Sequence, residues 1–247
     1  MRNYKQQLLN AFLDKYERSK SFKEDASKGR RIMIKLYDNG HSEFKAYNIE
    51  NAEIKDAYNR AIHGLKAASV VNYEWMKYED GNIIARVWLV LELLEDAYTL
   101  ADRKPKLVKV SEMLDLIAAI SQGVTSEWVS KYYQSTYSSI EKKRSITGDL
   151  PEDAELACDV LKAIKMIDSL QHGETLERAF SLRCFGDSKR FEKAVKARVV
   201  GIVRRFCVDD PDGELSDEDV LRQVGIIKAP EIVDFCGSVT VTLDTGV

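Results

Sequence analysis

Hydrophobic residues recur at helix or strand spacing along most of the chain. Residues 4–19 place their apolar side chains on one helical stripe. The segment 30–37 alternates apolar with polar residues, which predicts a half-exposed strand. Asn51 can cap a helix over 51–67, and two β-rich runs around the turn at 79–82 predict a hairpin directly after it. A helix followed by a hairpin is the order of a winged helix, with 51–67 in the place of its recognition helix.

The rest of the chain has mainly helical periodicity. We expect helices over 90–102, 112–121, 126–144, 152–170, 188–206 and 217–224, with breaks at 104–106 and 147–151. The segment 179–185 alternates like a strand, and Gly186 with Asp187 marks a turn after it. The apolar segment 231–247 predicts strands and ends on a turn signal, so we expect a larger protein to continue past Val247. The fold class is therefore α+β and mostly helical, and it ends in the first strands of a domain that this chain lacks.

Composition narrows the class of protein. A chain of 247 residues that is 45% hydrophobic and 31% charged is typical of an ordered globular protein. It has neither a secretory signal nor an apolar run of the ~18 residues that a membrane span needs, so we expect a cytoplasmic protein without membrane contact. The four cysteines are widely spaced and form no CxxC motif, which favours reduced, mostly buried thiols over a metal site.

The sequence contains few motifs typical of catalytic or metal sites. Signatures of nucleotide-binding loops, zinc proteases and serine hydrolases are absent. The acidic run at 209–219 lacks the ligand register of a calcium loop, so a solvated turn is the favoured interpretation. A cluster of Tyr132, Tyr133 and Tyr137 has no activating base nearby in the sequence, and it is interpreted as core rather than as a nucleophile. We therefore predict no catalytic residue and no metal ligand.

The strongest signal is a basic span at 183–205. It holds eight Lys or Arg residues against two acids, in a chain of net charge −3, which indicates a polyanionic partner. Asp187 or Ser188 can cap the helix, whose N-terminus could then offer N–H groups to a phosphate. A capped amphipathic helix whose basic stems cover its apolar edge explains the pattern equally well. The candidate DNA contacts are Arg183, Ser188, Lys189, Arg190, Lys193 and Lys196.

A second candidate surface lies on the helix predicted over 51–67. Lys55, Asn59, His63 and Lys66 share one face there, and these residue types reach phosphates or base edges. Because acids occupy parts of the same surface, an ordinary solvated helix face is the alternative.

Several segments resemble one known family. LLNAFLDKYERSKSF near the start, AIHGLKAASVVNYEW with IIARVWLV behind it, RAFSLRCFGDSKRFEK, and PEIVDFCGSVTV are similar to the JetD family of Wadjet plasmid-defence systems. The resemblance runs through the whole chain in order. It implies a relative of the topoisomerase VI A subunit, with an arm and a winged-helix-like region over 1–105, a helical CAP-like DNA-binding region over 106–230 and the start of a Toprim domain over 231–247.

The same resemblance implies a DNA endonuclease with Mg²⁺ or Mn²⁺ on clustered Toprim acids. Such a protein would act as a homodimer beside a condensin-like Jet complex and cut plasmid DNA. The family's acids lie beyond the FCGSVTV segment, so no catalytic residue and no cofactor carries over to this chain. We therefore expect the DNA-binding front half of such a nuclease, which positions duplex DNA, and whether this chain alone is an enzyme stays open. The alternatives are a winged-helix transcription regulator and an adaptor that binds partner proteins without DNA.

Overall fold

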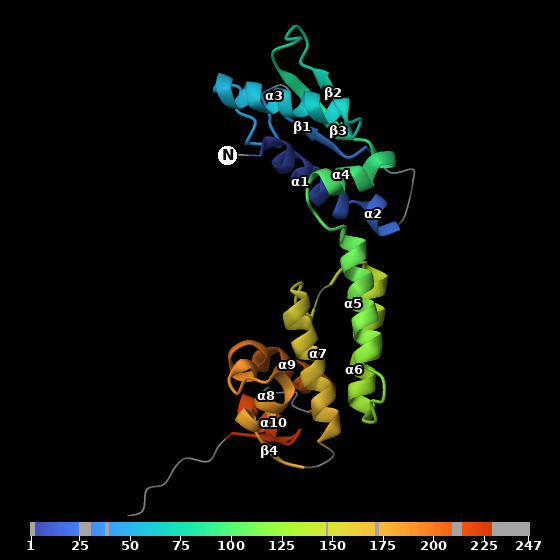
Figure 1. The fold of residues 1–247 in the computed structure, drawn as a ribbon, viewed down its shortest axis with the longest axis vertical. Helices are drawn as coiled ribbons and strands as arrows, with labels where there is room; N and C mark the ends of the chain where they lie inside the picture. The colour runs from blue at the N-terminus through green and yellow to red at the C-terminus, as the bar shows by residue number, and fades with distance from the viewer. Residues whose placement is uncertain are drawn as a thin grey trace, which may run out of the picture. The chain divides into compact units, whose positions relative to one another are not determined.

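The chain folds into two compact units. The computed structural model describes residues 3–24, 31–37, 40–146, 148–170, 173–208 and 214–228. Unit 1 comprises Met1–Leu114 with Ile140–Ser145, and unit 2 comprises Asp115–Ser139 with Ile146–Val247 (Figure 1). The expected α+β class with mostly helical content is confirmed. The domain boundaries at 105 and 230 stay predictions, and the strands predicted over 231–247 lie outside the described residues.

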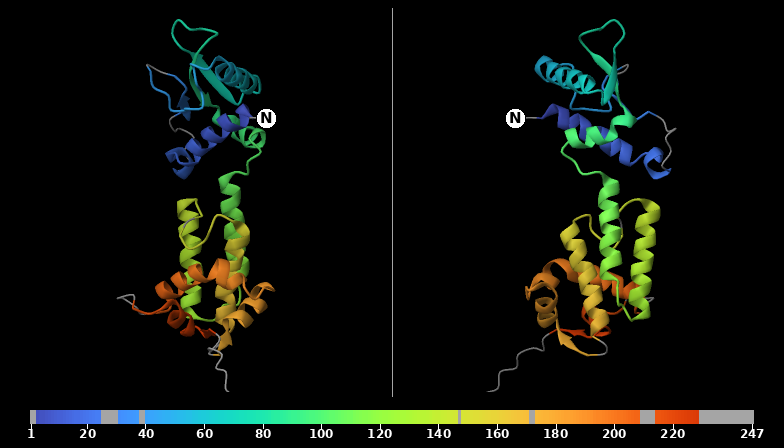
Figure 2. Two further views of the ribbon diagram at one scale, coloured as in Figure 1. Left: turned by 90° about the vertical axis from the view of Figure 1, so that its left-hand side faces the viewer. Right: turned by 45° about the vertical axis from the view of Figure 1, so that its right-hand side comes forward.

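Unit 1 joins a three-stranded sheet to a small group of helices. Its elements are α1 (Tyr4–Glu17), α2 (Lys20–Glu24), β1 (Met33–Lys35), α3 (Ala52–Ala67), β2 (Val71–Trp75), β3 (Ile84–Leu89), the 3₁₀ turn η1 (Leu91–Leu93) and α4 (Leu94–Leu100). The sheet has the order β1-β3-β2 with antiparallel pairs. Helix α3 packs against α1 and β2, and the loop between β2 and β3 projects beyond the sheet (Figure 2).

Apart from α2, which was not predicted, these elements of unit 1 lie close to their predicted positions because the core faces are regular. The leucines and Phe12 of the α1 stripe and the alternating residues Ile32, Ile34 and Leu36 are buried in one core, and Tyr4 and Tyr16 pack against it partly buried. The side chain of Asn51 accepts a hydrogen bond of 3.1 Å from the Ile54 N–H, which confirms it as the cap of α3. The hairpin is confirmed as β2 and β3. The assignment of α3 as a recognition helix stays a prediction.

Unit 2 is built from helices and one short pair of strands. Helices α5 (Lys106–Ile120) and α6 (Glu127–Lys143) begin in one unit and end in the other. The elements that follow are α7 (Ala154–Ser169), β4 (Thr175–Leu176), α8 (Glu177–Phe185), a π-helical turn η2 (Phe191–Val195), α9 (Lys196–Phe206), α10 (Asp217–Arg222) and β5 (Ile226–Ile227). Strands β4 and β5 pair in parallel, over a length too short to leave a sequence pattern.

The predicted strand at 179–185 is wrong, because this segment belongs to helix α8. In a strand Phe180 and Leu182 would share a face, whereas here Phe180 is buried and Leu182 is 56% exposed. Phe180 packs against Phe191 with ring centroids 5.0 Å apart. Gly186 ends the helix in the left-handed conformation at φ 72°. Contacts with the next helix therefore outweigh the local alternation.

The basic helix begins after this turn, close to its predicted start. Asp187 orders the turn before it, since its Oδ1 accepts a hydrogen bond of 2.8 Å from the Lys189 N–H, but no side chain caps η2 itself. The apolar side of this amphipathic helix is buried at Phe191, Val195, Val199, Ile202 and Val203, and half-buried at Phe206. This stripe fixes which side of the helix each basic residue occupies.

The cysteines only partly match the expectation. Cys158, Cys184 and Cys207 are free thiols, as predicted. Cys158 and Cys184 are half-buried, but Cys207 is exposed, so the expectation of burial is wrong there. Among the described helices, none has the length and apolar character needed to cross a membrane.

A buried carboxylate joins α7 to the start of α6. Asp168 is 7% exposed, and it accepts hydrogen bonds from the backbone N–H groups of Thr125 at 3.0 Å and Ser126 at 2.7 Å. Burial acts to raise the pKa of Asp168, but these hydrogen bonds outweigh it and hold the pKa below its ordinary value. The Asp168 carboxylate thus fixes the backbone turn that leads into α6.

Replacing Gly186 and Gly201 should change stability in opposite directions. Gly186→Ala places a side chain at positive φ and should lower the free energy of unfolding by about 1 kcal/mol. Gly201 lies inside α9 with open space where a Cβ would be, so Gly201→Ala should raise it by about 0.5–1 kcal/mol. Urea unfolding followed by circular dichroism measures both, and a shift of the same sign in the two variants would contradict the assignment.

Asp168→Asn should destabilise unit 2 in a manner that depends on pH. At pH 7 we expect a loss of about 1–2 kcal/mol, because the N–H groups of Thr125 and Ser126 lose a charged acceptor. The folded-state pKa is depressed, so the carboxylate's contribution is present above its unfolded pKa of about 3.9 and is lost as the pH falls through the folded value. The difference between wild type and variant in urea unfolding should therefore shrink from pH 7 to pH 3. An equal difference at both pH values would contradict this role.

Candidate nucleic-acid interface

The structure divides the cations at 183–205 into two sets. In the paired set, each basic side chain reaches an acid. The pairs are Arg190 Nη2 to Asp159 at 2.8 Å and to Glu155 at 3.2 Å, Lys196 Nζ to Glu177 at 2.7 Å, Arg204 Nη2 to Asp217 at 3.1 Å, and Arg205 Nη2 to Asp149 at 2.5 Å. The acids come from α7, α8, α10 and the segment before α7. The paired set therefore ties the neighbouring elements of unit 2 to the basic helix.

In two of these pairs the carboxylate is shielded from water, although the Arg190 side chain is 34% exposed. The side chains of Lys196 and Glu177 are 19% and 12% exposed, and that of Asp159 is 14% exposed. The hydrogen bond that Arg190 donates to Asp159 raises the pKa of Arg190. Removing the cation from such a pair leaves a carboxylate with little access to water. Arg190 and Lys196, both predicted as DNA contacts, are thus placed in structural ion pairs.

The other set faces solvent. Arg183, Lys189, Lys193 and Arg198 are exposed, and within the described residues their side chains have no hydrogen-bond or ion-pair partner. Arg198 is absent from the predicted contacts, although the exposed flank of the helix pattern could have identified it. Arg178 on α8, outside the basic span, is likewise exposed and has no hydrogen-bond or ion-pair partner among the described residues. Ser188 is exposed in the turn between α8 and η2.

The backbone of the Gly186 turn is already bonded within the protein. The Ser181 hydroxyl, fully buried, donates to the Asp187 carbonyl at 2.5 Å and accepts from the Phe191 N–H at 3.0 Å. The Lys189 N–H is used by Asp187. A phosphate at this turn would therefore meet basic side chains more than free N–H groups, which differs from the cradle expected from the sequence.

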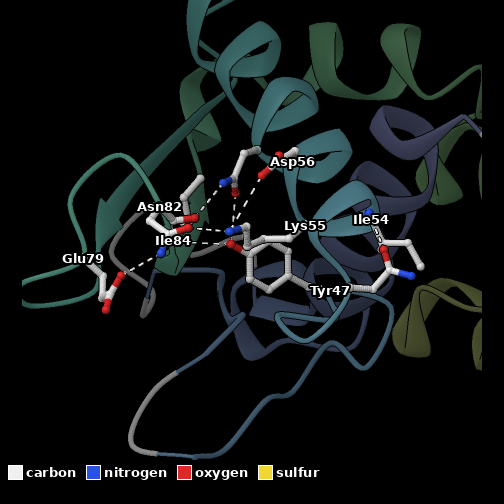
Figure 3. Close-up of polar contacts among 9 residues, drawn as sticks. Tyr47, Ile54, Lys55, Asp56, Glu79, Asn82 and Ile84 are labelled. Carbon is white, nitrogen blue, oxygen red and sulfur yellow. Dashed lines mark hydrogen bonds and ion pairs between the residues drawn. The ribbon is translucent and has the colours of Figure 1, made fainter.

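On α3 the structure separates the four predicted contacts. Lys55 has a side chain only 14% exposed; it donates to Asn82 Oδ1 and lies 3.8 Å from Asp56 (Figure 3). Asn59 is 7% exposed, and its amide is bonded to Tyr47 and to the Asn82 carbonyl. We predicted Lys55 and Asn59 on a solvated helix face, because the helical pattern alone gives no sign that the hairpin folds over them.

The other two residues of the α3 set remain on the surface. His63 Nδ1 lies 3.1 Å from the Tyr73 hydroxyl, and its ring centroid is 5.7 Å from that of Trp75. Lys66 is exposed and donates to Asn72 Oδ1 on β2. These contacts join the end of α3 to β2 and leave His63 and Lys66 accessible.

Two of the three tyrosines clustered on α6 belong to the core, as predicted, whereas Tyr137 is half-buried. Tyr132 and Tyr133 are buried, and burial raises the pKa of both hydroxyls. A phenol with a raised pKa is a poor nucleophile at neutral pH. In the part of the chain that the structure describes, no three His, Cys, Asp or Glu side chains come together to hold a metal ion. The described residues therefore do not fit the Mg²⁺ or Mn²⁺ site of a Toprim domain.

Comparison with known proteins gives one clear relative. The chain is 27% identical over 240 residues to Wadjet protein JetD of Bacillus cereus (strain Q1). The aligned region covers 97% of this chain and 57% of the length of that protein. This chain thus spans a little over half the length of that protein. No family model matches the chain, and no solved structure matches it. The similarity extends over nearly the whole chain and confirms the resemblance to the JetD family expected from the sequence.

Neutralising Arg190 should destabilise the protein more than neutralising Lys189, its neighbour. Lys189→Met removes an exposed, unpaired cation and should stay within about 0.5 kcal/mol of wild type in the free energy of unfolding. Arg190→Met leaves the shielded Asp159 without its partner, so we expect a loss clearly outside that range. Urea unfolding at pH 7 provides the comparison. Equal losses in the two variants would contradict the division into paired and solvent-facing cations.

Proposed function

We propose that this chain, a homologue of Wadjet protein JetD, binds duplex DNA through the solvent-facing cations of unit 2 and positions it for cleavage. One observation carries the proposal. Acids outnumber basic residues in the chain, yet Arg183, Lys189, Lys193 and Arg198 remain exposed, and their side chains have no ion-pair or hydrogen-bond partner among the described residues. Exposed cations of this kind neutralise DNA phosphates.

Helix α9 exposes small residues next to its solvent-facing cation Arg198. Ala197 and Gly201 are exposed on the same helix as Arg198, and nothing lies within 4 Å of the Cβ position at Gly201. Small side chains let a polyanion come close to the helix while longer basic side chains reach its phosphates. The paired cations add less, because a phosphate would have to displace an acid from each of them.

The proposed role is positioning, with strand cleavage left to other residues. The name of the relative places that protein in a Wadjet system, and by analogy we propose that this chain serves in a plasmid-defence complex. The described residues form no cluster of acids for a metal, so metal-dependent cleavage would be carried out outside them. Homodimer formation and contact with a condensin-like Jet complex are further parts of the proposal.

The transcription-regulator alternative has less support. It requires α3 to read base edges, and Asn59 is the residue type best suited to that task. Both polar atoms of the Asn59 amide are already bonded within unit 1. A regulator would also prefer one short duplex sequence, whereas phosphate contacts from unit 2 are independent of sequence.

The salt dependence of DNA binding tests the proposal. Fluorescence anisotropy with a 30-base-pair duplex should show affinity falling steeply as salt rises from ~0.05 to ~0.2 M. The double variant Lys189→Gln, Lys193→Gln should reduce the slope of log K against log salt by about 0.9 for each phosphate that is no longer neutralised.

The matched control is Lys142→Gln, Lys143→Gln, which removes the same charge from two exposed lysines of α6. This control should leave the slope unchanged. No binding by the wild-type chain, or an equal change in both double variants, would overturn the proposed function.

A further inference from the structure

The outward side of α8 carries an exposed leucine beside two arginines. Phe180 and Ser181 are buried on the inner side of this helix, at 1% and 0% exposure, and they fix its rotation. Leu182 then faces solvent at 56% exposure, the largest value for a leucine in the part of the chain that the structure describes. Arg178 lies four residues earlier, one turn away on the same side, and Arg183 directly follows the leucine.

The acid within α8 does not neutralise these arginines. Arg178 and Arg183 are exposed, and neither side chain has a hydrogen-bond or ion-pair partner among the described residues. Glu177 is the one acid in the sequence of α8, and its carboxylate, 12% exposed, is bonded to the Lys196 ammonium at 2.7 Å. The outward side of α8 is thus basic around a single large apolar side chain.

This side of α8 belongs to the same unit as the solvent-facing cations. Helix α8 packs against η2, where the ring centroids of Phe180 and Phe191 lie 5.0 Å apart. Over residues 177–193 five basic residues stand against three acids, so the local charge stays positive with Asp187 and Glu192 included. The elements on both sides of the Gly186 turn therefore favour a polyanion.

A leucine among cations fits a partner that offers apolar surface between its phosphates. A single exposed leucine is common on protein surfaces, so its position beside two unpaired arginines carries the argument. The minor groove of duplex DNA has phosphates along its edges, with sugars and base edges between them. Proteins that bind this groove combine basic side chains with apolar ones such as leucine.

We propose that α8 makes a second contact with duplex DNA, in which Leu182 packs into the minor groove and Arg178 and Arg183 bind the phosphates beside it. The proposal deepens the proposed function and rests on it, because it adds Arg178 and Leu182 to the cations named there. Guanine places an amino group in the minor groove, which hinders an apolar side chain. The contact should therefore favour A·T-rich DNA over G·C-rich DNA without selecting one short sequence.

Substitutions of Leu182 separate apolar contact from charge. In fluorescence anisotropy with an A·T-rich 30-base-pair duplex, Leu182→Ala should weaken binding about tenfold and leave the slope of log K against log salt unchanged. Leu182→Met keeps an apolar side chain of similar size and should keep the affinity. The matched control is Leu100→Ala, which shortens a leucine 49% exposed in unit 1 and should bind like wild type.

Urea unfolding separates a lost contact from a lost fold. Because Leu182 faces solvent, Leu182→Ala should keep the wild-type midpoint. Wild-type affinity in a folded Leu182→Ala variant would overturn the proposal and favour a protein partner for the exposed leucine.

Arg178→Gln tests the charged part of the contact. It should reduce the slope of log K against log salt by about 0.9, because one phosphate is no longer neutralised. Lys142→Gln removes one charge from an exposed residue of α6 and should leave the slope unchanged. An unchanged slope in Arg178→Gln would overturn the phosphate contact on α8.

A G·C-rich duplex of the same length tests the groove. The wild-type chain should bind it more weakly than the A·T-rich duplex, and Leu182→Ala should reduce this difference. An equal loss of affinity for both duplexes in Leu182→Ala would overturn the minor-groove contact and leave the proposed function intact. Failure of the wild-type chain to bind either duplex would overturn the proposed function instead.

Discussion

Burial of a single apolar stripe on α9 decides what the basic span of this chain can do. Val199, Ile202 and Val203 are buried, and this fixes the rotation of the helix. With the rotation fixed, Lys196 and Arg204 fall where acids of α8 and α10 meet them, and Arg198 falls where no described element covers it. Burial of this stripe therefore decides both which cations form ion pairs within unit 2 and which cations remain exposed to a polyanion.

The ion pairs also decide which cations are available to a phosphate. The more exposed pairs, those of Arg204 and Arg205, contribute little net free energy of folding, because attraction in water is weak and ordering long side chains has an entropic cost. Their effect on binding is larger, since a paired cation already has a carboxylate where a phosphate would sit. A local count of charge in the sequence thus overstates the binding surface, by four of the eight cations in this span.

The features that could be predicted from the sequence are those that depend on residues close to one another in the chain. The cap of α3 at Asn51 and the alternation around Ile34 depend on neighbours in the chain, and the structure confirms both. The segment at 179–185 has a strand-like pattern because its helical state depends on a contact with Phe191, beyond the turn. Lys55 and Asn59 look like surface residues for the same kind of reason. Residues that lie more than twenty positions later in the hairpin cover them, and no pattern within α3 reports that contact.

The central claim is that duplex DNA meets the solvent-facing cations of unit 2 and not the paired ones. Lysine footprinting, with acetylation of the free and DNA-bound chain read by mass spectrometry, tests it residue by residue. The account predicts that Lys189 and Lys193 react readily without DNA and are protected when the duplex is bound. Lys196, held by Glu177, should react slowly in both states, and Lys142 and Lys143 should react equally in both. Equal reactivity of Lys189 and Lys193 with and without bound duplex would contradict the account.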